Sequence, residues 1–330
     1  MPLSVAIIYN DPFTDIPNQI GESEAIVGVL EEVVAVKKAL LELGHTVQQV
    51  PLHRPLDNAI NTLASVRADL IFNIFEGFDD DPSSEPVIAR WMEDREIRFT
   101  GNPSHVLELT LDKVRTKLVL NKVGIKTPLY QLLNSATLTR FNLEFPCIVK
   151  PQSEDASHGL LPESVVSNVE QLANQVERVS NSFGGIALVE EFVDGREFNA
   201  SVLGNETLSL VEISEITYSL PPGLPRLLTF ESKWFEETEY YAGTGVTCPA
   251  PIDSGLKKTI SDIVLKGCTS VGCRGYARVD MRQDPAGDIK VLEINANPDI
   301  SPELGIARQA EAIGLTYTQL IEKIVNLALE

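Results

Sequence analysis

The chain has 330 residues, a formal net charge of −20 at pH 7, four cysteines and four histidines. This length is enough for two or three domains, while the charge argues against nucleic acid or an anionic membrane as a partner. No apolar run is long enough to span a bilayer, and the cysteines and histidines follow no zinc-ligand or catalytic-triad spacing. The composition therefore favours a reduced, cytoplasmic protein without zinc chemistry.

The N-terminal region alternates strands with helices. Residues 4–9 form a short apolar run without a basic leader, and we expect a first strand there rather than a signal peptide. A polar loop over 10–24 precedes a helix whose apolar face ends at Gly44. Apolar strands are expected again at 46–52 and 69–75. This order predicts an α/β domain with a doubly wound parallel sheet.

The expected ligand-binding edge of this sheet is polar but carries no nicotinamide motif. No G-x-G-x-x-G follows the first strand. Ligands of such sheets bind at the carboxyl ends of the strands, which indicates residues 10–24 and 76–85. The acidic run at 79–81 is more typical of a solvated loop than of a metal site. Glu31 and Glu32, at the start of the first helix, either face a substrate amine or complement the helix N-terminus.

In the middle of the chain a buried strand ends in a lysine. Residues 145–151 form this strand, and a loop of polar and small residues over 152–159 follows Lys150. Such a loop can cover phosphates with backbone N–H groups while the lysine supplies charge. A lysine before a polar loop is also a common surface feature, so the pattern alone leaves both interpretations open.

A second apolar strand, at 186–193, ends in acidic residues. Backbone groups of residues 191–193 are candidates for reading an adenine edge, and Glu197 for accepting hydrogen bonds from ribose hydroxyls. Farther along, Lys233 is a single lysine among aromatic residues, and it either contacts a ligand or packs against Trp234.

A hairpin near the C-terminus is the strongest pattern in the chain. Two arms with period-two alternation, 276–282 and 291–298, flank a Pro-Ala-Gly-Asp turn. Pairing Asp284 with Ile289 across this turn fixes the register by counting. The residues expected on one face are Arg278, Asp280, Glu293 and Asn295, and those expected on the other are Val279, Met281, Leu292 and Ile294.

The first of these faces is a candidate metal site. Asp280 is expected opposite Glu293, and two facing carboxylates repel each other unless a cation binds them. Together with Asn295 they form an all-oxygen set that suits Mg2+ or Mn2+, and Arg278 beside it would neutralise phosphate charge. The competing interpretation is a surface ladder in which Arg278 and Arg282 merely pair with the two acids.

In their order and spacing these motifs resemble the ATP-grasp ligases, and among them the D-alanine–D-alanine ligases. The matching stretches are Asp112-Lys113, Ile148-Val149-Lys150-Pro151, Val189-Glu190-Glu191, Gly195-Arg196-Glu197, Lys233, Arg278-Val279-Asp280 and Glu293-Ile294-Asn295-x-x-Pro298. The resemblance implies an ATP-grasp fold, α/β overall and α+β in its C-terminal half. The implied parts are an N-terminal doubly wound domain at 1–102, a central subdomain at 103–188 and a C-terminal subdomain with the metal site at 189–330.

The resemblance also implies a role for each matched residue. The residues that would bind ATP are Lys113, Lys150, Ser157, Gly159, Glu190, Glu191, Val193, Glu197 and Lys233. Two Mg2+ ions, replaceable by Mn2+, would be held by Asp280, Glu293 and Asn295. Catalysis would involve Ser157 in the phosphate loop, Lys233 at the γ-phosphate and Arg278 at the acyl phosphate and tetrahedral state.

The implied reaction is an ATP-dependent ligation of a carboxylate to an amine. The carboxylate attacks the γ-phosphorus to give an acyl phosphate, which the amine then attacks, with release of ADP. No protein nucleophile is required, in agreement with the scattered cysteines and histidines. The expected substrates are two small amino acids or amino-acid-like molecules, and the expected assembly, by resemblance, is a homodimer.

The amino-acid positions depart from the family pattern. Ala156 replaces a serine of the phosphate loop, Trp234 stands at a tyrosine position, Glu76 at a histidine position, and Leu304 where a serine would bind the acceptor carboxylate. The candidate substrate residues are Glu32, Trp234, Arg278, Ser301 and Leu304. We therefore expect an acceptor other than D-alanine. A genuine D-alanine–D-alanine ligase of peptidoglycan synthesis and a nucleotide-binding regulator without turnover remain the alternatives.

Overall fold

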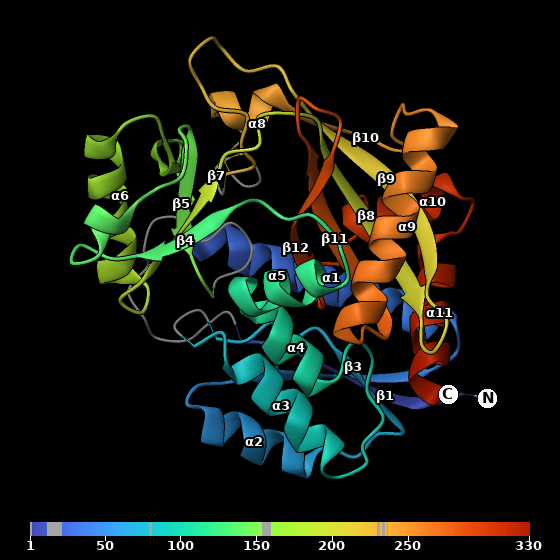
Figure 1. The fold of residues 1–330 in the computed structure, drawn as a ribbon. Helices are drawn as coiled ribbons and strands as arrows, with labels where there is room; N and C mark the ends of the chain where they lie inside the picture. The colour runs from blue at the N-terminus through green and yellow to red at the C-terminus, as the bar shows by residue number, and fades with distance from the viewer. Residues whose placement is uncertain are drawn as a thin grey trace.

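The structure is a computed structural model, drawn as a ribbon in Figure 1, and it describes residues 2–11, 22–78, 81–153, 160–229, 232, 235 and 237–330. For residues 22–27 it describes the backbone alone. No helix within these ranges is long and apolar enough to cross a membrane.

The N-terminal part is a parallel sheet with helices on both faces. Its strands, in the order β2-β1-β3, are β1 (Ser4–Asn10), β2 (Thr46–Leu52) and β3 (Leu70–Asn73), and its helices are α1 (Glu22–Glu42), α2 (Leu56–Ser65) and α3 (Ser84–Glu93). Val5 and Ile7 of β1 pack in a cluster with α1, whereas Ala6 and Ile8 pack in another with α2 and α3. A strand buried on both faces is the doubly wound arrangement predicted from the sequence.

Two helices lead from this sheet into a central lobe. They are α4 (Ser104–Leu111) and α5 (Lys113–Lys122). They are separate helices because the Asp112 side chain accepts hydrogen bonds from the Val114 and Arg115 amides, both at 3.0 Å, and so starts a new helix.

The central lobe is an antiparallel sheet of order β4-β7-β5-β6 with one long helix. The elements are β4 (Tyr130–Leu133), the 3-10 helix η1 (Leu138–Arg140), β5 (Cys147–Pro151), the 3-10 helix η2 (Pro162–Ser164), β6 (Val165–Val166), α6 (Val169–Ser182) and β7 (Ala187–Glu191). The lobe has its own apolar cluster, in which Leu172 and Val176 of α6 pack against Val149 of β5.

The C-terminal half is a five-stranded antiparallel sheet of order β10-β9-β8-β11-β12. Its elements are β8 (Glu197–Gly204), β9 (Ser209–Tyr218), α8 (Glu239–Gly243), β10 (Thr244–Thr247), α9 (Ser254–Val271), β11 (Gly275–Gln283), β12 (Ile289–Asn295), α10 (Gly305–Ala312) and α11 (Tyr317–Leu329). Helix α9 covers the apolar face, because Ile260 and Val264 pack in one cluster with Val202 and Val279.

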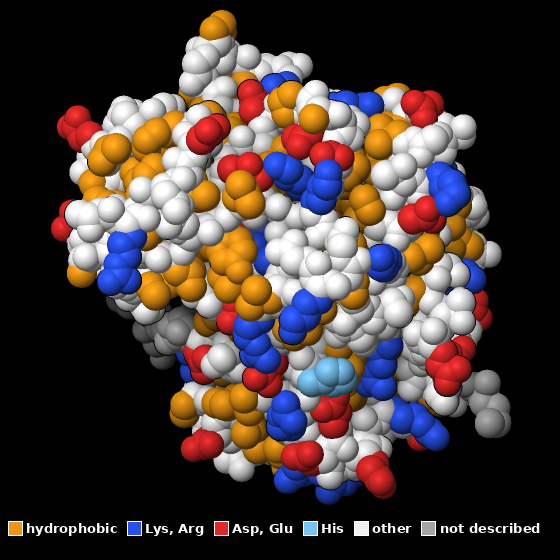
Figure 2. Space-filling view, viewed as in Figure 1, with side chains coloured by type: hydrophobic (Ala, Val, Ile, Leu, Met, Phe, Trp, Pro, Cys, Tyr) orange, Lys and Arg blue, Asp and Glu red, His pale blue; other side chains and the backbone are white. Residues whose placement is uncertain are grey.

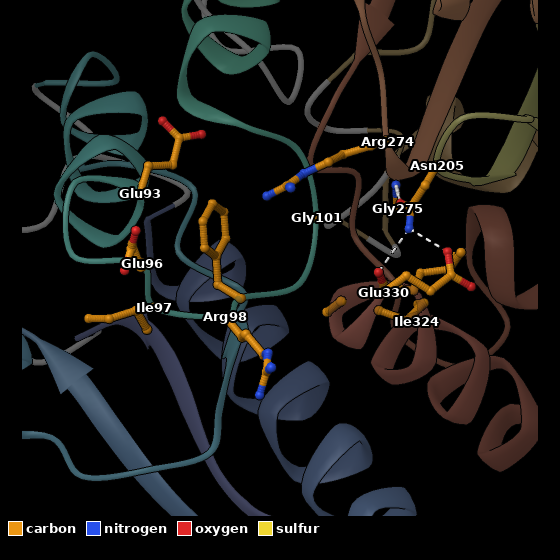
Figure 3. A pocket seen from close by; sticks show the side chains of 13 residues that line it. Glu93, Glu96, Ile97, Arg98, Gly101, Asn205, Arg274, Gly275, Ile324 and Glu330 are labelled. Atoms are coloured by element: carbon orange, nitrogen blue, oxygen red, sulfur yellow. Dashed lines mark hydrogen bonds between the residues drawn. The ribbon is translucent and has the colours of Figure 1, made fainter.

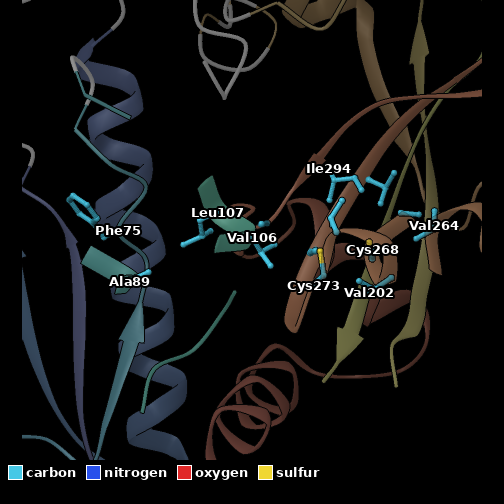
Figure 4. Close-up of a cluster of buried hydrophobic side chains, with 14 of the residues drawn as sticks. Phe75, Ala89, Val106, Leu107, Val202, Val264, Cys268, Cys273 and Ile294 are labelled. Carbon is cyan, nitrogen blue, oxygen red and sulfur yellow. The ribbon is translucent and has the colours of Figure 1, made fainter. Parts of the chain in front are cut away.

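The N-terminal part and the C-terminal sheet share a hydrophobic core. Figure 4 shows this cluster running from Phe75 and Ala89, through Leu107 of α4, to Ile294 of β12. At its edge the Asn102 side chain donates to the carbonyls of residues 276 and 296, at 2.7 and 2.6 Å. The division of the chain at residues 102 and 188 stays a prediction.

The surface in the view of Figure 2 has basic and acidic side chains intermixed, and apolar side chains gather over the lobe that contains α6. Ion pairs join the β11–β12 hairpin to the central part, including Lys126 with Asp288 and Lys290 with Glu191.

Candidate functional site

The β11–β12 hairpin brings together the polar residues predicted from the sequence. Arg278 lies opposite Asn295, and Asp280 lies opposite Glu293. Directly opposed residues of an antiparallel pair project from the same face of the sheet. The register predicted at these two pairs is therefore confirmed, whereas the metal role assigned to them stays a prediction.

The pairing next to the turn differs from the prediction, because Ile289 lies opposite Gln283 and not Asp284. A β-bulge farther along the hairpin shifts the register by one residue, so that the two pairs at the site are the predicted ones. The bulge also changes which side chain reaches the core. Val291 is 1% exposed, whereas Leu292, which we expected there, is only partly buried.

Arg278 and Asp280 form a bidentate ion pair. The Arg278 Nε and Nη2 atoms donate to the two carboxylate oxygens of Asp280 at 2.8 and 2.9 Å. The surface-ladder interpretation expected this pair, but the two side chains are only 20% and 18% exposed. It also expected Arg282 to pair with Glu293, whereas Arg282 pairs with Glu197. Burial raises the pKa of Asp280 and Glu293 raises it further, while Arg278 opposes both.

Glu293 lies among cations. The Lys113 Nζ is 3.2 Å from its Oε2. Burial disfavours the Glu293 carboxylate, but Lys113, Lys150 and Arg278 outweigh burial and lower its pKa to about 2. No three His, Cys, Asp or Glu side chains of the described chain are grouped to hold a metal ion. Asp280, Glu293 and Asn295 carry oxygen donors of the kind that Mg2+ prefers, and their role as metal ligands stays a prediction.

Next to this face, two lysines share one buried carboxylate. Glu190 of β7 forms ion pairs with Lys117 of α5 through Oε1 at 2.7 Å and with Lys150 of β5 through Oε2 at 2.8 Å. Burial works against ionisation of Glu190, but the two lysines lower its pKa. Lys117 was not assigned a role from the sequence, although its spacing of four residues from Lys113 places both on one face of α5.

The end of β7 and the two residues after it have one backbone N–H group, that of Val193, available to a ligand. The Glu191 and Phe192 amides already donate to carbonyls of neighbouring segments, both at 2.9 Å, whereas the Val193 amide has no acceptor among the described residues. The Glu191 side chain accepts from the Leu129 amide at 3.0 Å and from Lys290 at 2.6 Å. The predicted role of Glu191 in adenine binding would therefore fall to its backbone, and it stays a prediction.

Glu197 is anchored by residues that the sequence did not assign to the site. Tyr218 donates to its Oε2 at 2.7 Å, and Arg282 Nε donates to the same oxygen at 2.9 Å. Arg282 also donates to the Val193 carbonyl at 3.0 Å, and its guanidinium lies over the Phe192 ring. Period-two spacing from Arg278 and Asp280 was the signal that places Arg282 on this face.

Glu32 lies inside the molecule, in the middle of α1. Because α1 begins at Glu22, neither Glu31 nor Glu32 is at the helix start, and the explanation by the helix N-terminus is wrong. Glu32 is 4% exposed and accepts a hydrogen bond from the Ile300 amide at 3.1 Å. Burial raises its pKa well above the usual range, and the nearby Asp299 and Glu76 raise it further.

The segment from Asp299 to Leu304 leads to the N-terminus of α10. Ser301 is 8% exposed, and its amide donates to the Asp299 side chain at 2.7 Å. Leu304 precedes the helix as its N-cap, gives it no side-chain hydrogen bond and is 42% exposed. A Cβ added to Gly305 would lie 3.9 Å from Arg278 Nη1, so the start of α10 adjoins the guanidinium.

Gln309 holds α10 against the polar face of the sheet. This fully buried side chain donates to Asn199 Oδ1 at 2.9 Å and to Ser214 Oγ at 3.1 Å, and accepts from the Ser201 amide at 2.8 Å. Asn199 is paired with Asp280 across β8 and β11. The anchor thus fixes the start of α10 beside Arg278, and no local sequence signal indicated it.

Four residues of the predicted site lie outside the described residues, namely Ser157, Gly159, Lys233 and Trp234. Ala156, one of the departures from the family pattern, also lies outside them.

A cavity of about 320 Å³ lies elsewhere, where the N-terminal part meets β11 and α11. Figure 3 shows Arg274 and Asn205 on one side of it and Glu93 and Glu96 on the other. None of the residues assigned to the predicted site lines this cavity.

Comparison with known proteins gives matches over nearly the whole chain. The model of the D-alanine–D-alanine ligase C-terminus matches residues 119–326. An uncharacterised protein of Sinorhizobium fredii, y4sG, is 30% identical and covers 99% of this chain and 97% of its own length. The D-alanine–D-alanine ligase of Haemophilus influenzae is 28% identical, over 89% of this chain and 94% of that protein.

Solved structures show the same fold. The VanG D-Ala:D-Ser ligase of Enterococcus faecalis superposes with a TM-score of 0.77 at 19% identity, covering 99% of this chain and 100% of its own. The D-alanine–D-alanine ligase of Bacillus anthracis complexed with ATP superposes with a TM-score of 0.74 at 18% identity, covering 99% and 97%.

Proposed function

The chain belongs to the D-alanine–D-alanine ligase family of ATP-dependent, ADP-forming ligases, and we propose that it joins two amino acids or amino-acid-like molecules through an acyl phosphate. The observation that carries this proposal is the polar face of β11 and β12. There Asp280 faces Glu293, with Lys113 and Arg278 directly bonded to the two acids. This supports a site in which the carboxylates would hold cations and the basic side chains would bind phosphates.

ATP would lie between the central lobe and the C-terminal sheet. Lys113 and Lys150 would bind its phosphates under the loop that contains Ser157 and Gly159, and Lys233 would contact the γ-phosphate. Glu190, the Glu191 carbonyl and the Val193 amide would meet adenine, and this is supported by the Val193 amide having no acceptor among the described residues. Glu197, fixed by Arg282, would accept from the ribose.

Two Mg2+ ions, replaceable by Mn2+, would be held by Asp280, Glu293 and Asn295, and they would supply charge neutralisation for the phosphate groups. The protein's own groups do the rest of the work. Arg278, whose pKa is raised by Asp280 against the effect of burial, stays charged and would stabilise the oxygens of the acyl phosphate and of the tetrahedral state.

The first amino acid would place its amine near Glu32. Glu32 is buried, and Asp299 and Glu76 add negative potential around it, which is unfavourable without a cation. An ammonium group would relieve this repulsion. The substrate carboxylate would then point toward Arg278. Asp299 acts on both Glu32 and Arg278, because it also raises the pKa of the Arg278 guanidinium.

The second amino acid would lie at the start of α10, and we propose that it is not D-alanine. A carboxylate there would meet Arg278 and the helix N-terminus, but Leu304 provides no hydrogen-bond donor. Ser301, with its side chain nearby in sequence, is the candidate substitute. The alternative is a genuine D-alanine–D-alanine ligase of peptidoglycan synthesis, which Leu304 disfavours.

We also propose that the protein acts in the cytoplasm on small molecules and that it forms a homodimer. The substrate class is consistent with the family, and cytoplasmic action agrees with the requirement for ATP.

A phosphate-release screen tests the proposed function. The full chain is incubated with Mg·ATP and all pairs of D- and L-amino acids, and products are detected by mass. We expect ADP and phosphate release that depends on both amino acids, with a dipeptide-like product. Release of ADP without any ligated product, or no release with any pair, would contradict the proposal and leave a nucleotide-binding regulator as the better explanation.

A further inference from the structure

The buried cluster of Lys117, Glu190 and Lys150 contains one more cation than it has acids. Both oxygens of Glu190 are used, one by each lysine, at 2.7 and 2.8 Å. The three side chains come from α5, β7 and β5, so tertiary packing and not local sequence brings them together. A single carboxylate is thus held in place from two sides.

The two lysines differ in their access to a ligand. The Lys117 side chain is 1% exposed, like that of Glu190, whereas the Lys150 side chain is 10% exposed at the end of β5. Lys150 is followed by the polar stretch that contains the predicted phosphate loop, but Lys117 lies inside the molecule on α5. Only Lys150 is therefore placed to exchange its carboxylate partner for a phosphate.

Such an exchange has a cost if Glu190 is left without a cation. A buried carboxylate that loses its only partner is strongly unfavourable, because neither water nor another charge replaces that partner. Lys117 removes this cost, since it remains bonded to Glu190 after Lys150 has moved. The cation in excess, Lys150, is then available to a phosphate.

We propose that Lys117 is a positioning residue for nucleotide binding: it compensates Glu190 permanently and so allows Lys150 to leave that carboxylate for the phosphates. The proposal rests on the proposed binding of ATP in this cleft. Lys117 does not contact the nucleotide. Its role is to stay with Glu190, whereas Lys150 binds the phosphates.

The test measures binding of Mg·ATP and of adenosine to the full chain by titration calorimetry. In Lys117→Met, Lys150 becomes the only partner of Glu190, and phosphates must break that pair. We expect the Kd for Mg·ATP to rise about tenfold or more. Adenosine, which has no phosphates, should bind as it does to the wild type. Lys122→Met is the matched control, because this exposed lysine lies on the same helix, and its Kd should stay unchanged.

A double variant separates charge compensation from a general structural role. In Lys117→Met/Glu190→Gln the carboxylate that needs compensation is gone, so the Kd for Mg·ATP should return to that of Glu190→Gln alone. If Lys117→Met alone fails to fold, the double variant still tests the proposal, because it lacks the uncompensated charge of Glu190. Circular dichroism and melting curves verify the fold of each variant.

The outcomes are distinguishable. Equal Kd values for Mg·ATP in Lys117→Met and the wild type would overturn the proposal, as would an equal loss of adenosine and Mg·ATP binding. A double variant that folds but binds Mg·ATP far more weakly than Glu190→Gln would overturn it too. If the wild type binds neither ligand, the proposed function itself fails.

Discussion

The proposed nucleotide side and the proposed amino-acid side of the site differ in how their charges are balanced. On the nucleotide side each predicted acid is already bonded to a predicted or neighbouring cation. The pairs are Arg278 with Asp280, Lys113 with Glu293, Lys150 with Glu190 and Arg282 with Glu197. On the amino-acid side, burial instead raises the pKa of Glu32, and the nearby Asp299 and Glu76 raise it further.

This difference indicates two ways of preparing a site. On the nucleotide side, each carboxylate is neutralised by a basic side chain of the protein. Mg2+ would replace the basic side chains as partners of the carboxylates, and phosphate would replace the carboxylates as partners of the basic side chains. Each charged group would thus have a partner of opposite charge before and after binding. The amino-acid side keeps an excess of negative charge, which a cationic substrate would relieve. The family resemblance follows the same division, because the motifs match on the first side and depart on the second.

The largest effect is expected from Glu293→Gln. Removing this carboxylate should weaken Mg2+ binding and lower kcat/KM for ATP by about a hundredfold or more, since a bound metal contributes several kcal/mol to phosphoryl transfer. Steady-state kinetics over a range of Mg2+ concentrations measures both. Asp288→Asn is the control, because this side chain makes an exposed pair with Lys126 away from the paired acids. Equal losses in the two variants would contradict the assignment of the metal face.

Lys150→Ala is expected to raise the KM for ATP about tenfold, because it removes a charged contact to phosphate. The change in kcat should be smaller. Lys122→Ala, an exposed lysine of α5, should leave both parameters unchanged. Unaltered ATP kinetics in Lys150→Ala would mean that this lysine serves only Glu190, and the balanced nucleotide side would then be a structural feature.

On the amino-acid side, Leu304→Ser should improve D-alanine as the acceptor. A hydroxyl at the N-cap of α10 adds a donor for a carboxylate, which is worth roughly 1.5–3 kcal/mol, or about ten- to a hundredfold in KM. Kinetics with D-alanine as the varied acceptor would measure the gain, with Leu304→Ala as the control for size. If the wild-type enzyme already forms D-alanyl-D-alanine efficiently, the alternative function, a genuine D-alanine–D-alanine ligase, is the correct one.

The smallest effect concerns stability and pH. Because the pKa of Glu32 is raised in the folded state, this group favours folding at pH values below its unfolded pKa, and that contribution is lost as pH rises through the folded pKa. Glu32→Gln does not titrate and keeps an oxygen for the Ile300 amide. Its melting temperature should therefore gain on the wild type as pH increases from acid to neutral. The exposed Glu31→Gln should show no such trend, and a gap that closes with rising pH would contradict the explanation.

The sequence by itself determined the elements whose signals are local. Period-two alternation predicted the β11–β12 hairpin and placed Arg278, Asp280, Glu293 and Asn295 on one face, because side-chain direction in a strand depends only on counting. Counting failed for the pairs next to the turn, because a bulge beside Asp280 and Met281 shifts the register by one residue and sequence spacing does not reveal it. The doubly wound sheet followed from the order of strands and helices in the same way.

Tertiary structure decided which charges meet. Lys117 and Arg282 find their acids only because α5 packs beside β7, and β11 beside β8. Glu32 accepts a hydrogen bond from the Ile300 amide, 268 residues away in sequence. The sequence suggested a residue at a helix start, whereas packing makes Glu32 a buried group beside the proposed substrate site. Such pairings depend on burial, which sets the strength of each charge interaction, and burial is a property of the packed chain and not of any segment.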